Sequence, residues 1–348
     1  LPDLPKIPSE ANISDISNES EHYYITKDQG PTPSRMFTEK DIFHLVNLKL
    51  DQWQRRWMGT IEASKGTKKC VVLTTFTDKV LQRKDIHWDE FVKRTLDLPS
   101  ARYLVNIEGI GIIKAKLHLI QEHYACETLN LWIGNVFRQE QLKDTVYLSE
   151  VMSLIAGILE GLNLIHSYGF LHPGLSSKKI LLVDKGLCKI YDFCLSKDAP
   201  NMTSFKKSKM PPSLNHFPPE TLHRNEYSRP SDVWSAAGVI WEILAGTLPF
   251  SYAQDGTTFE NQIDAPPESQ IILYEQLKNK LLYQCWHLVC PRRPTIRELR
   301  ESYQVIFESL RDDTYEIPRI DLYTSMATGT QDGKEETEVY TDTYAAVS

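Results

Sequence analysis

The feature that most constrains the fold is a change of hydrophobic pattern partway along the chain. From residue 45 to residue 124, short segments with alternating apolar side chains indicate strands, for example residues 69–76 and 117–121. From residue 131 on, apolar side chains recur every three or four positions, which is typical of helices with one buried face. A strand-rich unit therefore precedes a helix-rich unit, which predicts an α+β protein with two lobes.

Both ends of the chain are polar and lack a sustained hydrophobic period. Residues 1–43 are rich in Pro, Ser and Asn and predict a flexible leader, and residues 311–348 are acidic and predict a disordered tail. The intervening residues 44–310 predict one folded domain. Its N-terminal lobe is expected at residues 44–124 and its C-terminal lobe at residues 125–310.

Composition and charge argue against several classes of site. A net charge of -7 offers no basic surface for the phosphates of nucleic acid, so no nucleic-acid partner is expected. No stretch reaches the roughly 18 apolar residues of a membrane span, so any membrane segment is expected outside this chain. The six cysteines are scattered without C-x-x-C spacing, which favours a reducing compartment over a structural metal.

Two motifs stand in a shared register within the second unit. His172 and Gly174 precede an apolar segment, and Asp192 and Phe193 follow further along. These residues resemble the catalytic loop H-R-D-L-x-x-x-N and the D-F-G motif of protein kinases. Gly174 stands in the place of the catalytic aspartate, and its separation from Asp192 is the one that protein kinases have.

Further matches follow in the family's order. Residues 217–220 resemble the A-P-E element, residues 231–238 the S-D-V-W-S-x-G segment, and residues 285–295 the C-W-x(6)-R-P-T stretch typical of tyrosine kinases. The resemblance implies a bilobal protein-kinase fold with an N-terminal antiparallel β-sheet lobe and a larger α-helical C-terminal lobe. It also implies an ion pair between Glu220 and Arg293. The positions that stack the lobes together would be His172, Phe193 and Asp232.

The residues that carry phosphoryl transfer in this family are replaced. A lysine normally holds the phosphates, aspartate and asparagine hold the metal ions, and a second aspartate orients the hydroxyl. Here Thr74 stands for the lysine, Gly174 for the catalytic aspartate and Lys179 for the asparagine. A hydroxyl cannot neutralise phosphate, glycine cannot accept a proton and lysine repels a metal ion. We therefore predict a pseudokinase with no catalytic residues, no metal site and no required cofactor.

The glycine-rich loop of the family aligns onto residues 54–59, which leaves Gly59 as the only glycine of three. Gln54 and Arg56 would occupy space that the backbone normally yields to phosphate, although Arg56 could supply a substitute cation. Glu90 is the nearest candidate for the family's helix glutamate. If a nucleotide pocket persists, with its hinge near residues 122–124, the resemblance places in it Gly59, Ile61, Val72, Glu122, Tyr124, Leu181 and Asp192.

The tail carries tyrosines in acidic surroundings. Tyr315, Tyr340 and Tyr344 resemble phosphorylation sites, and a phosphate there would offer an arginine-bearing module a docking point. The alternative is a solvated tail without a docking role. The expected activation segment, residues 195–217, contains no tyrosine, which fits a substrate of another kinase rather than a self-activating enzyme.

Leader, kinase-like domain and tail together resemble the inactive cytoplasmic part of a receptor tyrosine kinase. The resemblance implies a location on the cytoplasmic side of a membrane, with a soluble adaptor as the alternative. It implies signalling partners such as an active tyrosine kinase and phosphotyrosine-binding modules. Two functions remain open: a scaffold or allosteric partner in phosphotyrosine signalling, and an atypical nucleotide-binding or weakly active kinase.

Overall fold

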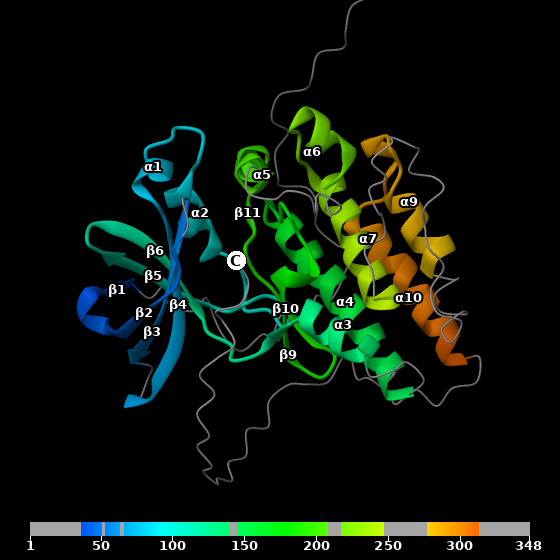
Figure 1. Ribbon diagram of the computed structural model, residues 1–348, viewed down its shortest axis with the longest axis horizontal. Helices are drawn as coiled ribbons and strands as arrows, with labels where there is room; N and C mark the ends of the chain where they lie inside the picture. Colours follow the sequence, from blue (N-terminus) through cyan, green and yellow to red (C-terminus); the bar gives the residue numbers. More distant parts are fainter. Residues whose placement is uncertain are drawn as a thin grey trace, which may run out of the picture.

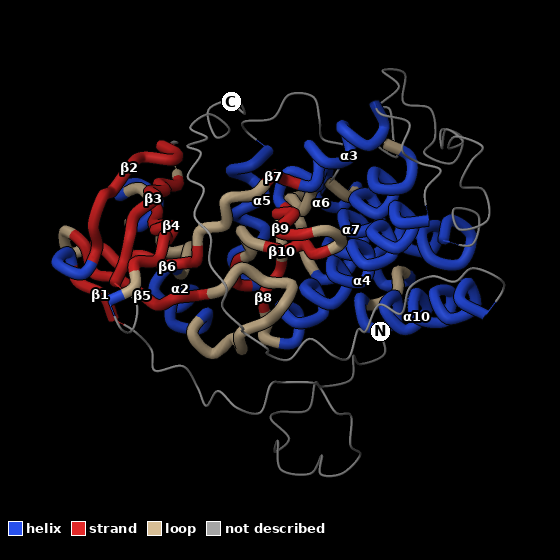
Figure 2. The backbone as a smooth tube through the Cα atoms, turned by 90° about the horizontal axis from the view of Figure 1, so that it is seen from below, coloured by secondary structure: helices blue, strands red, loops and turns tan. Residues whose placement is uncertain are grey.

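The computed structural model describes residues 36–50, 53–62, 66–138, 145–207, 217–246 and 277–312. These residues form two lobes, a sheet-rich one and a helix-rich one, which stand side by side in Figure 1. Figure 2 shows the same division, with the long strands at one end of the molecule and most helices at the other. The predicted α+β bilobal fold is confirmed.

The N-terminal lobe is a six-stranded sheet in the order β1-β5-β6-β4-β3-β2. Neighbouring strands are antiparallel except that β1 runs parallel to β5, a pairing that differs from the expected all-antiparallel sheet. Two short helices, α1 (Asp78–Leu81) and α2 (Trp88–Thr95), connect β4 to β5. The strands are β1 (Met36–Thr38), β2 (Ile42–Leu50), β3 (Gln54–Glu62), β4 (Lys68–Phe76), β5 (Ile107–Ile113) and β6 (Lys116–Glu122).

The folded part begins earlier than the sequence suggested. The leader was expected to reach residue 43, but β1 and the start of β2 belong to the sheet. Phe37 and Ile42 anchor this segment, because both are buried in a cluster on the outer face of the sheet. Four polar residues separate the short apolar pair Met36-Phe37 from Ile42, so the pattern gave no sign of β1.

The C-terminal lobe is built around two buried helices, α4 (Thr145–Ser167) and α7 (Arg229–Ala245). The apolar positions predicted to line one face of α4, such as Ile155, Ile158 and Ile165, are completely buried. Almost every residue of α7 is buried, so this helix crosses the centre of the lobe. The remaining helices are α3 (Leu129–Arg138), α5 (Ala199–Lys207), α6 (Pro219–Arg224), α9 (Tyr283–Cys285) and α10 (Ile296–Asp312).

Short strands form the face of this lobe that looks toward the sheet. They are β7 (Glu127–Thr128), β8 (Phe170–Leu171), β9 (Ile180–Asp184), β10 (Leu187–Ile190) and β11 (Cys194–Leu195). Short 3-10 turns occupy Ser177–Lys179 and Ser196–Asp198, and a π-turn occupies Lys278–Leu282. The segments that resemble the catalytic loop and the D-F-G motif therefore lie between β8 and α5, at the boundary of the two lobes.

The hydrophobic core is continuous across that boundary. The main cluster joins side chains of the sheet and α2, such as Phe76 and Phe91, to side chains of the helical lobe, such as Phe170 and Phe193.

None of the described helices is both long and apolar enough to cross a membrane. All six cysteines lie in the described residues, and none forms a disulfide.

Candidate functional site

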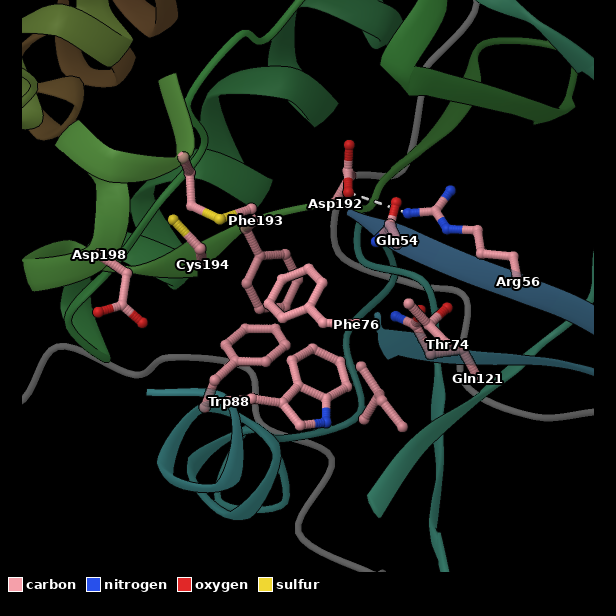
Figure 3. Close-up of a pocket in the computed structure, with 13 residues that line it drawn as sticks. Gln54, Arg56, Thr74, Phe76, Trp88, Gln121, Asp192, Phe193, Cys194 and Asp198 are labelled. Carbon is pink, nitrogen blue, oxygen red and sulfur yellow. Dashed lines mark hydrogen bonds and ion pairs between the residues drawn. The ribbon is translucent and has the colours of Figure 1, made fainter. Parts of the chain in front are cut away.

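One face of β3 and β4 forms the wall of the cleft on the side of the N-terminal lobe. In their antiparallel register Arg56 lies opposite Thr74, and Gln54 lies opposite Phe76. Because side chains alternate along a strand, these four residues share the face that looks toward the helical lobe. Together they line one cavity with Asp192 and Phe193 from the segment before β11 (Figure 3).

Asp192 is paired with two cations, one from each lobe. Nη2 of Arg56 lies 2.9 Å from Oδ1 of Asp192, and Nζ of Lys179 lies 2.9 Å from Oδ2. The Asp192 side chain is 6% exposed, and those of Arg56 and Lys179 are 15% and 23% exposed. Both cations also lie over the ring of Tyr191, with 5.3 Å from the Arg56 guanidinium to the ring centroid and 5.7 Å from Lys179 Nζ. One largely buried carboxylate is thus shared by two positive charges.

The backbone holds Asp192 in a conformation that points its side chain into the cleft. Its φ is 70°, in the left-handed region that few non-glycine residues adopt, aspartate and asparagine more often than most. The resemblance to protein kinases identified Asp192 as a retained metal-ligand position and Lys179 as a replaced one. It did not predict that the two side chains form an ion pair. Nothing in the linear spacing showed that Arg56 would reach Asp192, because 136 residues separate the two.

Thr74, in the position of the family's lysine, is almost completely buried at 4% exposure. Its Oγ1 has no hydrogen-bond partner among the described residues. Glu90, the candidate for the helix glutamate, lies elsewhere: its carboxylate is on the outside of α2, paired with Lys197 and near Arg94. Bonding to Lys197, opposed by slight burial, lowers the pKa of Glu90. The side chains of α2 that reach the cavity are instead Trp88 and Phe91.

Aromatic rings fill the interior of the cleft, where active protein kinases hold a lysine–glutamate ion pair. Neighbouring rings in this series have centroids 4.6 to 5.9 Å apart, mostly in tilted or edge-to-face arrangements. The series leads from the sheet through α2 to the helical lobe, and its members are Trp53, Phe76, Trp88, Phe91, Phe193 and Phe170. The spacing of Trp88 and Phe91 by one helical turn was the only sign of it in the sequence.

The segment after β11 is bound to the loop before α2. The carboxylate of Asp198 accepts a hydrogen bond from the backbone N–H of His87 at 3.0 Å and lies 2.6 Å from its Nδ1. Asn201 donates to the carbonyl oxygen of Asp85 at 3.0 Å. With the Lys197–Glu90 pair, these contacts hold the start of the activation segment against the N-terminal lobe.

Two predicted pocket residues lie on the wrong side of the sheet. Residues 54–59 were aligned with a loop, but they are part of strand β3. Gly59 and Ile61 therefore point away from the cleft: a Cβ on Gly59 would meet Leu45 and Leu73, and Ile61 is fully buried in the outer cluster. The expectation that they line the nucleotide pocket is wrong, because a one-residue alternation along a strand changes the face.

The other predicted pocket residues are closer to the cleft. Val72 shares a strand face with Thr74, and Leu181 lies in β9, paired with Lys189. At the hinge, Glu122 accepts hydrogen bonds from Tyr124 at 2.9 Å and from Asn106 at 2.7 Å. Burial and this bond to Glu122 raise the pKa of Tyr124. None of these four residues lines the cavity beside Asp192.

The predicted structural residues are brought together as expected. Arg293 and Glu220 form a bidentate pair, with Nη1–Oε1 at 2.7 Å and Nη2–Oε2 at 2.9 Å, and both side chains are almost fully buried. Burial opposes ionisation of Glu220, but the bonds from Arg293 prevail and lower its pKa. Asp232 accepts hydrogen bonds from the backbone N–H of His172 at 2.9 Å and from the Tyr227 hydroxyl at 2.6 Å.

Residues 67–304, more than half of the chain, match the family model described as the protein kinase domain. The chain belongs to the protein kinase family. Its relatives include receptors: it is 26% identical over 200 residues to fibroblast growth factor receptor homolog 2 of Drosophila melanogaster, and 24% identical over 284 residues to human ephrin type-A receptor 1. These matches make the chain tyrosine-kinase-like within the family.

The matched regions cover 53% and 76% of this chain but only 18% and 27% of the two receptors. The chain therefore spans about a quarter or less of the length of these relatives. The tail tyrosines Tyr315, Tyr340 and Tyr344 lie outside both the matched domain and the described residues.

Proposed function

We propose that this chain is a pseudokinase that acts as a scaffold or allosteric partner in phosphotyrosine signalling. The observation that carries the proposal is the double pairing of Asp192 with Arg56 and Lys179. In an active kinase this aspartate binds magnesium together with an asparagine. Here both of its oxygens already face a positive side chain.

A magnesium–nucleotide complex does not fit these residues. A divalent cation at Asp192 would lie beside two positive charges, and the repulsion would be strong in a partly buried site. The cavity beside Asp192 has a volume of about 30 Å³, room for roughly two water molecules. The part of the chain that the structure describes contains no group of three or more His, Cys, Asp or Glu residues placed to hold a metal ion.

The remaining parts of the catalytic apparatus are also missing. Thr74 supplies no charge to a phosphate, and Phe91 rather than an acid faces the cavity from α2. Gly174 has no side chain to orient a hydroxyl. Because phosphoryl transfer depends almost entirely on positioning and charge stabilisation, the loss of these groups together is expected to remove turnover.

The signalling role is supported by the receptor relatives and by the tail. We propose that this chain is the intracellular part of a receptor or a soluble adaptor derived from one. An active tyrosine kinase would phosphorylate Tyr315, Tyr340 or Tyr344, and phosphotyrosine-binding modules would then dock there.

Catalysis is tested by incubating the purified chain with labelled ATP, magnesium and a tyrosine-containing peptide, beside an active receptor kinase domain. We expect no transfer of label to peptide or chain. Labelling that depends on magnesium and disappears in Asp192→Asn would overturn the proposal.

Docking is tested with tail peptides that carry phosphate at Tyr315 or Tyr340. We expect phosphotyrosine-binding modules to be recovered with the phosphorylated peptides and not with the matched unphosphorylated ones. Equal recovery from both would contradict a phosphate-dependent scaffold. The second candidate function, an atypical nucleotide-binding protein, is favoured by one observation only, the presence of Arg56 in the cleft.

A further inference from the structure

One ion pair joins the two walls of the cavity. Arg56 belongs to β3 in the N-terminal lobe, and Asp192 precedes β11 in the C-terminal lobe; their charged groups meet across the cleft (Figure 3). Both side chains are largely buried, so salt and water screen this pair less than they screen a pair on the surface. The pair therefore helps to hold the lobes together.

The guanidinium of Arg56 is directed toward the opposite lobe. Besides Asp192, it contacts the ring of Tyr191, whose centroid lies 5.3 Å away. Its Nε has no hydrogen-bond partner among the described residues, and neither has Oγ1 of Thr74, which lies opposite Arg56 in the neighbouring strand. The contacts with Asp192 and Tyr191 both cross the cleft, so separation of the lobes would break them.

Lys179 binds the same carboxylate from within the C-terminal lobe. Its Nζ lies 2.9 Å from Oδ2 of Asp192. Because both residues belong to one lobe, this pair does not have to break when the lobes separate. If Arg56 were removed, Lys179 would still neutralise Asp192, and no uncompensated charge would be left buried.

The lobes also meet at the other end of the cavity, beside α2. Phe91 of α2 packs edge-to-face against Phe193 with ring centroids 5.9 Å apart, and the backbone N–H of His87 donates to Asp198. Figure 3 shows Asp198 and Arg56 at opposite ends of the cavity. The α2 contacts hold one side of the interface between the lobes, and the ion pair of Arg56 holds the other.

We propose that the Arg56–Asp192 pair is a latch that keeps the cleft closed without a nucleotide. Closure then depends on attraction between two charges of the same chain and does not require a ligand. Loss of either charge releases one side of the interface, and the lobes open there while each keeps its fold. The latch deepens the proposed allosteric role and rests on it in one respect: a partner that contacts both lobes would meet one fixed arrangement of them.

Two native cysteines report whether the cleft opens. Cys194 lines the cavity at 7% exposure, and the cavity has room for roughly two water molecules, less than the reagent iodoacetamide requires. Alkylation of Cys194 therefore requires opening. Cys188 is the internal control: it is completely buried in β10 with Sγ facing the carbonyl oxygen of Leu154, so it reacts only when the helical lobe itself opens.

The test is alkylation of the intact chain by iodoacetamide without nucleotide, with each site followed by mass spectrometry. Arg56→Gln and Asp192→Asn are each expected to speed alkylation of Cys194 about fivefold and to leave Cys188 unchanged. The two substitutions change the local charge in opposite directions, so acceleration in both cannot come from altered reactivity of the thiol.

Two further variants remove the same positive charge without breaking the latch. Arg55→Gln acts on an exposed neighbour of Arg56 that points to the opposite face of β3. Lys179→Gln removes the partner of Asp192 that lies in its own lobe. In both, alkylation of Cys194 should be no faster than in the parent chain.

Three outcomes would each overturn the inference. They are an unchanged Cys194 rate in Arg56→Gln or Asp192→Asn, a Cys194 rate in Lys179→Gln as fast as in Arg56→Gln, or equal acceleration of Cys188 in both latch variants. Asp192→Asn keeps the test valid if Arg56→Gln unfolds. Label transfer in the kinase assay would refute the proposed function separately, because alkylation without nucleotide does not measure turnover.

Discussion

Two acidic residues from kinase-like motifs, Glu220 and Asp192, have different kinds of ion-pair partners in this molecule. Glu220 forms a buried bidentate pair with Arg293, as the resemblance to the family implied. Asp192, in the D-F-G-like motif, instead forms ion pairs with two side chains from different lobes, Arg56 and Lys179.

The difference teaches where a kinase fold tolerates change. The partner of Glu220 belongs to the same chain, so the pair is part of folding and removal of either member leaves a buried charge. The partners of the active-site residues in this family are a nucleotide and its metal ions, which come from outside. When those ligands are not used, the cleft can be re-paired internally without disturbing the core of the helical lobe.

The largest effect is expected for Arg293→Ala. It would leave the nearly inaccessible Glu220 carboxylate without its main partner, and the free energy of unfolding is expected to fall by about 3 to 5 kcal/mol. Chemical denaturation measures the change. The double variant Glu220→Ala/Arg293→Ala is the control and should lose clearly less than the sum of the single variants; strict additivity would show that the pair does not stabilise the lobe.

The next effect concerns Glu242 of α7, whose pKa burial raises to about 7, although Ser177 and Lys178 act in the opposite direction. The unfolded chain loses this proton near pH 4.5 and the folded chain only near pH 7. Stability should therefore fall as pH rises between these values, by up to about 3 kcal/mol from this residue.

Glu242→Gln removes that contribution, so the difference in stability between variant and parent should grow from pH 5 toward neutral pH and then level off. Denaturant unfolding at several pH values gives the measurement. A difference that does not change with pH would mean that Glu242 is ionised throughout.

A smaller loss is expected for Tyr227→Phe, also in the helical lobe. The Tyr227 hydroxyl donates to Asp232 at 2.6 Å and lies 3.0 Å from the carbonyl oxygen of His172. Loss of this bond to a charged group is expected to cost about 1.5 to 3 kcal/mol. The midpoint and slope of urea unfolding measure it, and an unchanged midpoint would show that water replaces the hydroxyl.

The smallest stability effect is expected in the cleft itself. Asp192→Asn breaks both ion pairs, but Arg56 and Lys179 are partly exposed and can turn to solvent, so the cost should be about 1 kcal/mol. Thermal unfolding of this variant beside Arg293→Ala ranks the two regions directly. If Asp192→Asn were less stable than Arg293→Ala, the cleft ion pairs would contribute more to folding than the Glu220–Arg293 pair, contrary to expectation.

Much of the architecture followed from linear pattern. The strands predicted at residues 69–76 and 117–121 appear as β4 and β6 with nearly the expected ends. The pairing of Glu220 with Arg293 was implied by the resemblance to protein kinases. These features were predictable because they depend on local periodicity or on motifs whose partners lie within the domain.

The site was less predictable, and particular residues show why. Gly59 and Ile61 were assigned to the pocket because a motif was aligned without knowledge of strand register, and register decides which face a side chain occupies. Glu90 was sought inside the cleft, but α2 turns Phe91 inward and Glu90 toward Lys197.

The sequence by itself determined the kinase fold, and the motif alignment predicts Thr74, Gly174 and Lys179 at the positions of the family's lysine, aspartate and asparagine. Only the tertiary structure decided which charged side chains meet in the cleft. The lobes bring Arg56 and Lys179 to Asp192 from distant parts of the chain, and a Coulomb interaction depends on distance in space rather than on separation in sequence.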